Sequence, residues 1–142
     1  MQKLVCGPRQ SGRTTYLAKY IAEKVMGGDG GRITVTSPSF RRTKNLLEIV
    51  RDILGDECKT NHSVDSLTIS FNGWKIHSFV ANPSKVCSHR PDLLVVDDFD
   101  ECSSELKVSI AFHSGDLLFS TLNFGPSYVW YSLNGEIEEL NG

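Results

Sequence analysis

The chain has 142 residues, a length that suits one domain with a single hydrophobic core and leaves no room for a second catalytic domain. Its formal charge of −2 excludes a global basic field, so any contact with nucleic acid must come from a local patch or from partner subunits. It has neither a bilayer-length apolar run nor a signal peptide, which predicts a soluble intracellular protein with no membrane partner. Its four scattered cysteines indicate neither a disulfide framework nor a zinc ribbon.

Residues 4–16, LVCGPRQSGRTTY, are typical of a strand, a tight polar loop and the start of a helix. Gly7 and Gly12 have the spacing of the phosphate-binding pattern G-x-x-x-x-G-K-[ST], whose backbone aims N–H groups at a phosphate. Thr14 stands where a hydroxyl binds Mg²⁺, but Arg13 replaces the usual lysine. The alternative is a plain turn between a strand and a helix. The predicted phosphate loop comprises Gly7, Pro8, Arg9, Gln10, Ser11, Gly12, Arg13, Thr14 and Thr15.

Hydrophobic periodicity predicts helices at about 13–26 and 42–54, separated by a β-branched strand at 32–36. The glycines of 27–31 end the first helix, and a hydroxyl in Ser37-Pro38-Ser39 is placed to cap the second. This alternation is typical of an α/β fold with a parallel sheet. The second helix is predicted to bury Leu46, Leu47, Val50, Ile53 and Leu54.

The middle of the chain interrupts this alternation. Residues 55–64 are polar and irregular, which predicts a loop. Two runs of period two, at 67–71 and 75–79, then flank Asn72-Gly73, the signature of a two-residue hairpin turn. We expect an antiparallel pair appended to, or entering, one side of the sheet, followed by a polar loop at 81–91.

The second strong signal is the run Leu93 to Val96, whose lack of alternation is typical of a central parallel strand covered on both faces. Asp97 and Asp98 follow it at the carboxyl end, where open α/β sheets bind ligands. Further elements are predicted as a helix at 104–113, a buried strand at 116–121 beside the phosphate-loop strand, a last strand at 128–133, and a solvated acidic end at Glu136, Glu138 and Glu139.

These residues allow phosphoanhydride hydrolysis, which needs a metal, an oriented water and charge compensation. Asp97 would hold Mg²⁺ with Thr14, and Asp98 would polarise the attacking water. Arg9 could fold over the γ-phosphate as an arginine finger in cis, or could instead pair with an aspartate or with solvent. The alternative for the acidic cluster is a helix N-cap with acidic first-turn residues.

Two further groups of polar residues have open interpretations. Ser120 or Thr121 could sense the γ-phosphate and pass its loss to the loop around Asn123, or could cap its own turn. A compact basic group could touch a nucleic-acid backbone, or could form the solvated start of a helix. This group comprises Arg41, Arg42 and Lys44.

Together these segments resemble the ATPase domain of the large terminase subunits, the DNA-packaging motors of tailed bacteriophages. PRQSGRTT at 8–15 resembles their deviant Walker A, in which an arginine inside the loop is typical. Residues 32–54, with TSPSFR at 36–41, are similar to their second strand and helix, and 69–73 to their hairpin. PDLLVVDD at 91–98 resembles their Walker B, and STLNFG at 120–125 their coupling motif. The resemblance covers nearly the whole chain in the right order.

The resemblance implies a P-loop NTPase of the additional-strand, RecA-like type, a three-layer fold with a mainly parallel sheet and an antiparallel hairpin. Arg9 would be the arginine finger, Asp97 the Mg²⁺ ligand and Asp98 the catalytic carboxylate, with Arg13 also at the reacting phosphates. Residues 120–123 would couple hydrolysis to DNA movement. The implied cofactors are ATP and Mg²⁺. The implied partners are double-stranded DNA, nuclease and portal subunits, and further copies of the chain, in the host cytoplasm.

The sequence departs from that family at three positions: Arg13 replaces lysine, Asp98 replaces the usual glutamate, and Leu122 replaces proline. An adenine-binding N-terminal segment and a C-terminal nuclease are also missing from the pattern, which suggests a minimal ATPase or one piece of a split machine. Two other classes remain open. One is a nucleotide-binding switch or scaffold with little hydrolysis, favoured by Arg13 and Asp98. The other is a small phosphotransferase, which would need an arginine-rich lid after the acidic strand.

Overall fold

The computed structural model describes residues 2–8, 10–64, 66–80, 91–105, 115–122 and 135–140. The first half contains β1 (Gln2–Cys6), α1 (Arg13–Gly27), β2 (Gly31–Ser37), α2 (Phe40–Leu54), the 3-10 turn η1 (Gly55–Glu57) and β3 (Lys59–His62). The second half contains β4 (Leu67–Phe71), β5 (Trp74–Val80), β6 (Leu93–Val96), the 3-10 turn η2 (Phe99–Glu101), β7 (Asp116–Thr121) and β8 (Glu136–Glu139). Among these residues, no helix is long and apolar enough to cross a membrane.

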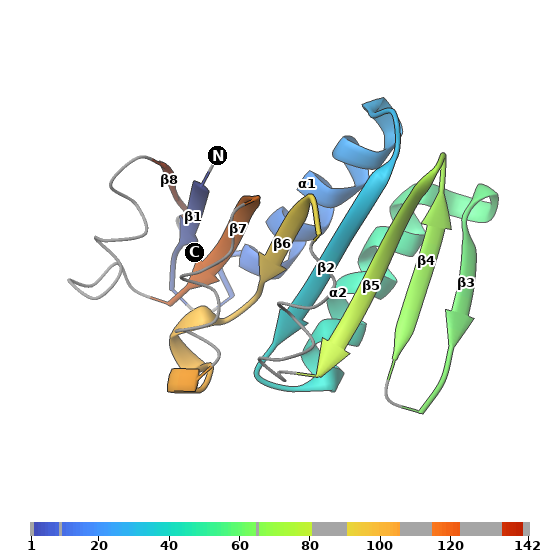
Figure 1. Ribbon diagram of the computed structural model, residues 1–142. Helices are drawn as coiled ribbons and strands as arrows, with labels where there is room; N and C mark the ends of the chain where they lie inside the picture. The colour runs from blue at the N-terminus through green and yellow to red at the C-terminus, as the bar shows by residue number, and fades with distance from the viewer. Residues whose placement is uncertain are drawn as a thin grey trace.

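All the strands belong to one eight-stranded sheet in the order β3-β4-β5-β2-β6-β7-β1-β8 (Figure 1). Neighbouring strands run parallel along β5-β2-β6-β7-β1-β8. β3 pairs antiparallel with β4, and β4 pairs antiparallel with β5. β7 lies beside β1, the strand before the phosphate loop, as predicted, and its other neighbour is β6. The predicted α/β class, with a mainly parallel sheet and an antiparallel hairpin, is therefore confirmed.

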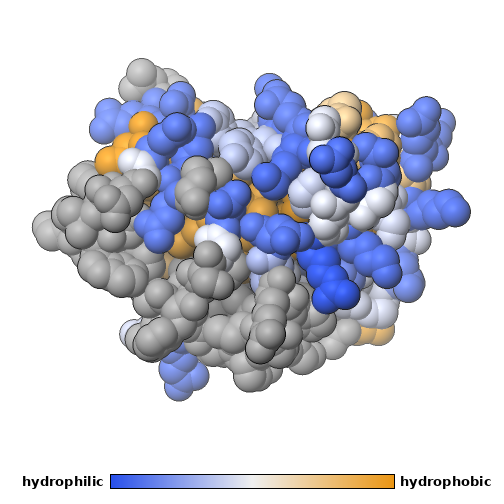
Figure 2. Space-filling model, turned by 45° about the horizontal axis from the view of Figure 1, so that its top comes forward, coloured by the Kyte–Doolittle hydropathy of each residue, from blue (hydrophilic) through white to orange (hydrophobic). Residues whose placement is uncertain are grey.

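Apolar residues cover both faces of the central strands. α1 and α2 lie on one face, behind the sheet in Figure 1, and pack a large cluster against it. A smaller cluster from β1, β6, β7 and η2 lies on the other face, where the rings of Phe99 and Phe119 are 5.0 Å apart. On the surface shown in Figure 2, the described residues are mostly hydrophilic, and hydrophobic ones show in small areas. The four apolar residues of β6 are all buried, because the strand contributes side chains to the clusters on both faces of the sheet.

The two helices follow the predicted periodicity. α1 buries Leu17, Ala18, Ile21, Ala22 and Val25. α2 begins at Phe40, two residues before the prediction, because Ser39 caps it: its Oγ accepts the N–H of Arg42 at 3.3 Å. The prediction that Ile53 is buried is wrong, since 40% of Ile53 is exposed and Thr43 is buried in the stripe instead. Successive helical residues point about 100° apart, so Leu54 takes the inward direction that Ile53 cannot share.

We expect Leu47→Ala to lower the free energy of unfolding by about 2–5 kcal/mol, because Leu47 is fully buried in the main cluster. Ile53→Ala, on the same helix, should lower it by about 0.5 kcal/mol or less, as is usual for surface positions. Urea denaturation of both variants measures this difference. Equal losses would contradict the assignment of the buried face of α2.

The predicted hairpin is confirmed and enters the sheet. Phe71 pairs with Trp74 around a turn in which both Asn72 (φ 51°) and Gly73 (φ 81°) are left-handed. β5 then runs parallel beside β2. The prediction of a loop at 55–64 is wrong, because this stretch contains η1 and β3. All four residues of β3 are exposed at the edge of the sheet, so no hydrophobic alternation marks the strand.

Glu136, Glu138 and Glu139 are exposed, as predicted for a solvated acidic end, but their backbone forms a strand that was not predicted. These residues form β8, which pairs parallel with β1 from Lys3↔Glu136 to Cys6↔Glu139. All its side chains are exposed, so the strand depends on backbone pairing with β1 and has no apolar pattern. Three predicted segments lie outside the described residues: the loop at 81–90, the helix beyond residue 105, and the strand at 128–133.

Candidate phosphate-binding site

The loop between β1 and α1 contains two described residues with a left-handed backbone. Gln10 (φ 61°) and Gly12 (φ 88°) are both left-handed, a conformation that occurs in backbone nests that bind anions through their N–H groups. α1 begins at Arg13, and no side chain caps it in the described part of the chain. The N–H groups of its first turn therefore remain available to an anion.

Gly7 is required by close packing at the other end of the loop. A Cβ built at Gly7 would lie 2.5 Å from Ser11 Oγ and 2.8 Å from the carbonyl oxygen of Leu140, the residue after β8. The N–H of Gly7 also donates to the carbonyl of Thr121 at the end of β7, at 3.3 Å. The loop is thus held between its two neighbouring strands, and a side chain at position 7 would push it out of place.

Two buried polar atoms in this loop lack hydrogen-bond partners among the described residues, namely Ser11 Oγ and Arg13 Nη1. Both residues line a cavity of about 210 Å³ formed by residues 10–15. Burying unpartnered polar groups is costly unless a ligand completes their hydrogen bonds. A hydroxyl, a guanidinium and uncapped N–H groups together have the chemistry of an anion site.

Asp97 joins the loop to the end of β6. Its side chain is buried, and its Oδ2 accepts a hydrogen bond from Thr14 Oγ1 at 2.8 Å. Its Oδ1 accepts from Ser120 Oγ at 2.6 Å, and the same hydroxyl accepts the N–H of Asp98 at 2.8 Å. The structure therefore brings together Thr14, Asp97 and Ser120, three residues singled out from the sequence. Ser120 is fully buried, with its hydroxyl committed to the two aspartates.

Asp98 lies between two arginines. Its Oδ1 is 3.3 Å from Arg13 Nη1, and its Oδ2 is 3.3 Å from Arg42 Nη1. Burial and the neighbouring Asp97 raise the pKa of Asp98 above its usual value, against the opposing effect of the two arginines. A carboxylate with a raised pKa accepts a proton more readily. Asp98 precedes η2, but its side chain makes no capping hydrogen bond there, which weighs against the N-cap interpretation.

Arg42 is the residue whose place the sequence interpretation missed. It was grouped with Arg41 and Lys44, yet it forms ion pairs with Asp98 and, at 2.8 Å, with Glu101. Lys44 instead lies 3.9 Å from Glu48, one turn along α2, and Arg41 is exposed. A signal was present, because Arg42 follows β2, Asp98 follows β6, and adjacent parallel strands end at the same edge of a sheet.

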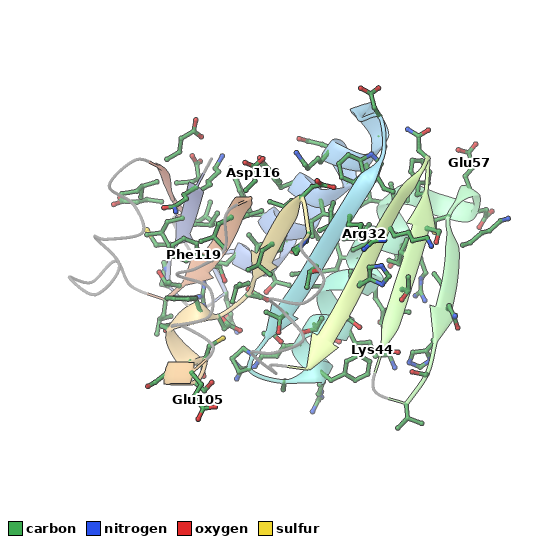
Figure 3. The ribbon with its side chains drawn as sticks, viewed as in Figure 1. Arg32, Lys44, Glu57, Glu105, Asp116 and Phe119 are labelled. Carbon is green, nitrogen blue, oxygen red and sulfur yellow. The ribbon has the colours of Figure 1, made fainter. Side chains whose placement is uncertain are left out.

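The site lies at the carboxyl edge of the sheet, the lower edge in Figure 1. In Figure 3, Asp116, the first residue of β7, marks the upper edge of the sheet, and Glu105, which follows η2 in the chain, lies below the lower edge. A cavity of about 290 Å³ beside the loop is lined by Arg13, Arg42, Asp98, Asp100, Glu101 and Leu122. Thr121 is buried at the end of β7. Arg9 and Asn123 lie outside the described residues.

No family model matches the chain, and no curated protein matches it. Among solved structures, the large terminase of a thermophilic bacteriophage is similar over 99% of this chain and 40% of its own, with a TM-score of 0.68 and 12% identity. The complex of that terminase with ADP is similar over 98% and 39%, with a TM-score of 0.68 and 13% identity. The large terminase ATPase domain of Thermus phage P74-26 is similar over 99% and 74%, with a TM-score of 0.60 and 12% identity.

The chain thus spans about 40% of the length of the thermophilic phage terminase that it matches. At these identities the likeness concerns the fold. The fold is that of the large terminase ATPase domain, which confirms the structural part of the resemblance drawn from the sequence.

Proposed function

We propose that this chain binds Mg·ATP in the loop of residues 7–15 and hydrolyses it as the ATPase module of a terminase-like DNA-packaging machine. The observation that carries the proposal is the hydrogen bond from Thr14 Oγ1 to Asp97 Oδ2 at 2.8 Å, which joins the loop to the acidic end of β6. Two similar solved structures, the thermophilic phage large terminase with ADP and with ATP-gamma-S, lend support by fold and ligand.

The phosphates would lie against the uncapped first turn of α1. The backbone of residues 12–15 would supply N–H donors, and Ser11 and Arg13 would supply buried side-chain donors that make no hydrogen bond among the described residues, although Arg13 is ion-paired with Asp98. Arg13 would form a planar, two-pronged contact where lysine forms a point contact. Arg9 would act in cis as the arginine finger.

Thr14 and Asp97 fit a magnesium site, because a hydroxyl and a buried carboxylate, already in contact, are the hard oxygen donors that Mg²⁺ prefers. Mg²⁺ would neutralise charge on the β- and γ-phosphates. Ser120 fixes the other oxygen of Asp97, so the carboxylate cannot turn away from Thr14. The alignment of these two residues therefore depends on β7 as well as on β6.

Asp98 would orient the attacking water and accept its proton. The side chain projects from a left-handed backbone (φ 51°) beside Arg13, at the edge of the cavity that adjoins the loop. The raised pKa of Asp98 makes it a better proton acceptor than an exposed aspartate. Because aspartate is one methylene shorter than glutamate, Asp98 would reach the attacking water only if the loop and the end of β6 lie close together.

Loss of the γ-phosphate would be relayed through Ser120, Thr121 and Asn123. The contacts that support this path are those of Ser120 with both aspartates, and that of the Thr121 carbonyl with the N–H of Gly7. We further propose double-stranded DNA as the load, reached by Arg41 and Lys44, with nuclease, portal and additional ATPase subunits as partners in the host cytoplasm.

A second candidate is a nucleotide-binding switch or scaffold that turns over slowly or not at all. The ion pair between Arg13 and Asp98 favours it, because the pair occupies both the phosphate-binding cation and the proposed proton acceptor. Turnover would require ATP to break this pair. The two candidates share nucleotide binding and differ in hydrolysis.

We expect Mg²⁺ to tighten binding of a fluorescent ATP analogue to the native chain and to a Thr14→Ser variant, which keeps the hydroxyl. Thr14→Val should bind the analogue with little response to Mg²⁺, because it keeps the shape but lacks the oxygen. Equilibrium titrations with and without Mg²⁺ measure this difference. A native chain that fails to bind ATP at millimolar concentration would contradict both candidate functions.

A further inference from the structure

Asp98 has a second cation that comes from outside the phosphate loop. Arg13 begins α1 and faces Oδ1, whereas Arg42 lies in the first turn of α2 and faces Oδ2, each at 3.3 Å. The two oxygens of one carboxylate therefore face two arginines from two different helices.

Arg42 has an anchor other than Asp98, whereas no described residue besides Asp98 pairs with the guanidinium of Arg13. The guanidinium of Arg42 forms a fork on Glu101, with Nη1 donating to Oε2 at 2.8 Å and Nη2 to Oε1 at 3.4 Å. Its backbone N–H is held by Ser39 at the start of α2. Arg13 Nη1 makes no hydrogen bond among the described residues, and it lies in the loop that would receive the phosphates. A bound triphosphate would therefore attract Arg13 and leave Arg42 where it is.

The backbone of Asp98 is already fixed. Its N–H donates to Ser120 Oγ at 2.8 Å, and its carbonyl accepts the N–H of Glu101 at 3.0 Å. What remains to be set is the direction of the carboxylate, and the arginines are its ion-pair partners in the described part of the chain.

We propose that Arg42 is a positioning residue for Asp98: it holds Oδ2 in place when Arg13 turns to the phosphates, and so leaves Oδ1 open to the attacking water. Without nucleotide, Arg13 Nη1 lies 3.3 Å from Oδ1 and restricts the approach of water to it. Glu101 anchors Arg42. With Glu101 ionised, the group of Arg42, Asp98 and Glu101 carries one net negative charge. This role deepens the proposed function and rests on it.

The test compares Arg42→Gln with Arg51→Gln. Arg51 is on the last turn of the same helix and lies 3.8 Å from Asp52, so it offers the same change of charge away from the site. Arg42→Gln should lower the kcat for ATP about 10- to 100-fold, as expected for a misplaced reacting group, with KM and the Kd of Mg·ATP within about twofold of native. Arg51→Gln should match the native chain. Arg42→Lys should fall between them, because an ammonium cannot form the fork.

A double-mutant cycle separates positioning from a merely structural role. Glu101→Gln should also lower kcat, and the double variant Arg42→Gln/Glu101→Gln should be no slower than Arg42→Gln alone, since both act through one contact. A kcat for Arg42→Gln equal to that of Arg51→Gln, or a change confined to the free energy of unfolding, would overturn the positioning role alone. A native chain that neither binds nor hydrolyses ATP would overturn the proposed function and this inference with it.

Discussion

Asp98→Asn is expected to lower the turnover of ATP by about 10²- to 10⁴-fold while the chain still binds Mg·ATP. The amide keeps the size of the side chain but removes the proton acceptor and the charge that holds Arg13 and Arg42 at 3.3 Å. Single-turnover release of phosphate measures the chemical step, and a separate titration measures nucleotide affinity.

Asp98→Glu is the matched control, because it keeps the carboxylate and adds the methylene that the terminase pattern has at this position. It should keep turnover, and it should raise turnover if the shorter acid limits the native chain. Native-like turnover of Asp98→Asn would remove Asp98 from the reaction and move the proton acceptor elsewhere.

Arg13→Ala is expected to weaken binding of Mg·ATP about 10- to 100-fold, the equivalent of losing charge-assisted hydrogen bonds worth about 1.5–3 kcal/mol. The side chain of Arg13 is only 13% exposed, so a phosphate contact there would be little screened by water. Isothermal titration with ATP and with ADP measures the loss, which should be larger for ATP if Arg13 reaches the γ-phosphate.

Arg13→Lys distinguishes the two candidate functions at the same position. Lysine keeps the positive charge but lacks the guanidinium whose Nη1 lies 3.3 Å from Asp98 Oδ1, so nucleotide binding should survive. Faster turnover in this variant than in the native chain would favour the switch, in which the native arginine restrains hydrolysis. Slower turnover would favour an ATPase that has adapted to arginine, and unchanged affinity in Arg13→Ala would exclude Arg13 from the phosphates altogether.

The sequence predicts well those elements whose backbone structure requires a recognisable pattern of side chains. The apolar stripe of α1, the Asn72-Gly73 turn and the unbroken apolar run of β6 each need particular side chains to form. β3 and β8 do not, because both are polar edge strands held by backbone hydrogen bonds to one neighbour. For this reason the sequence predicts a loop in place of β3, which is wrong, and predicts that the acidic end is solvated but not that it forms β8.

The candidate site divides in the same way. The spacing of the phosphate loop and the strand end before Asp97 pointed to Thr14 and Asp97, which lie in hydrogen-bond contact. The place of Arg42 depends instead on which strands are neighbours, since only the pairing of β2 with β6 brings residues 42 and 98 together. The local sequence predicts that Arg42 belongs to a basic surface group, whereas the sheet topology places it beside Asp98 in the site.

Steady-state release of phosphate from Mg·ATP by the native chain, with and without double-stranded DNA and candidate partner subunits, tests hydrolysis directly when it is measured beside Asp98→Asn. We expect turnover by the native chain that requires Mg²⁺, with a loss of about 10²-fold or more in the variant. ATP binding without turnover under any of these conditions, together with turnover restored by Arg13→Lys or Asp98→Glu, would contradict hydrolysis as the native function and leave the nucleotide-binding switch.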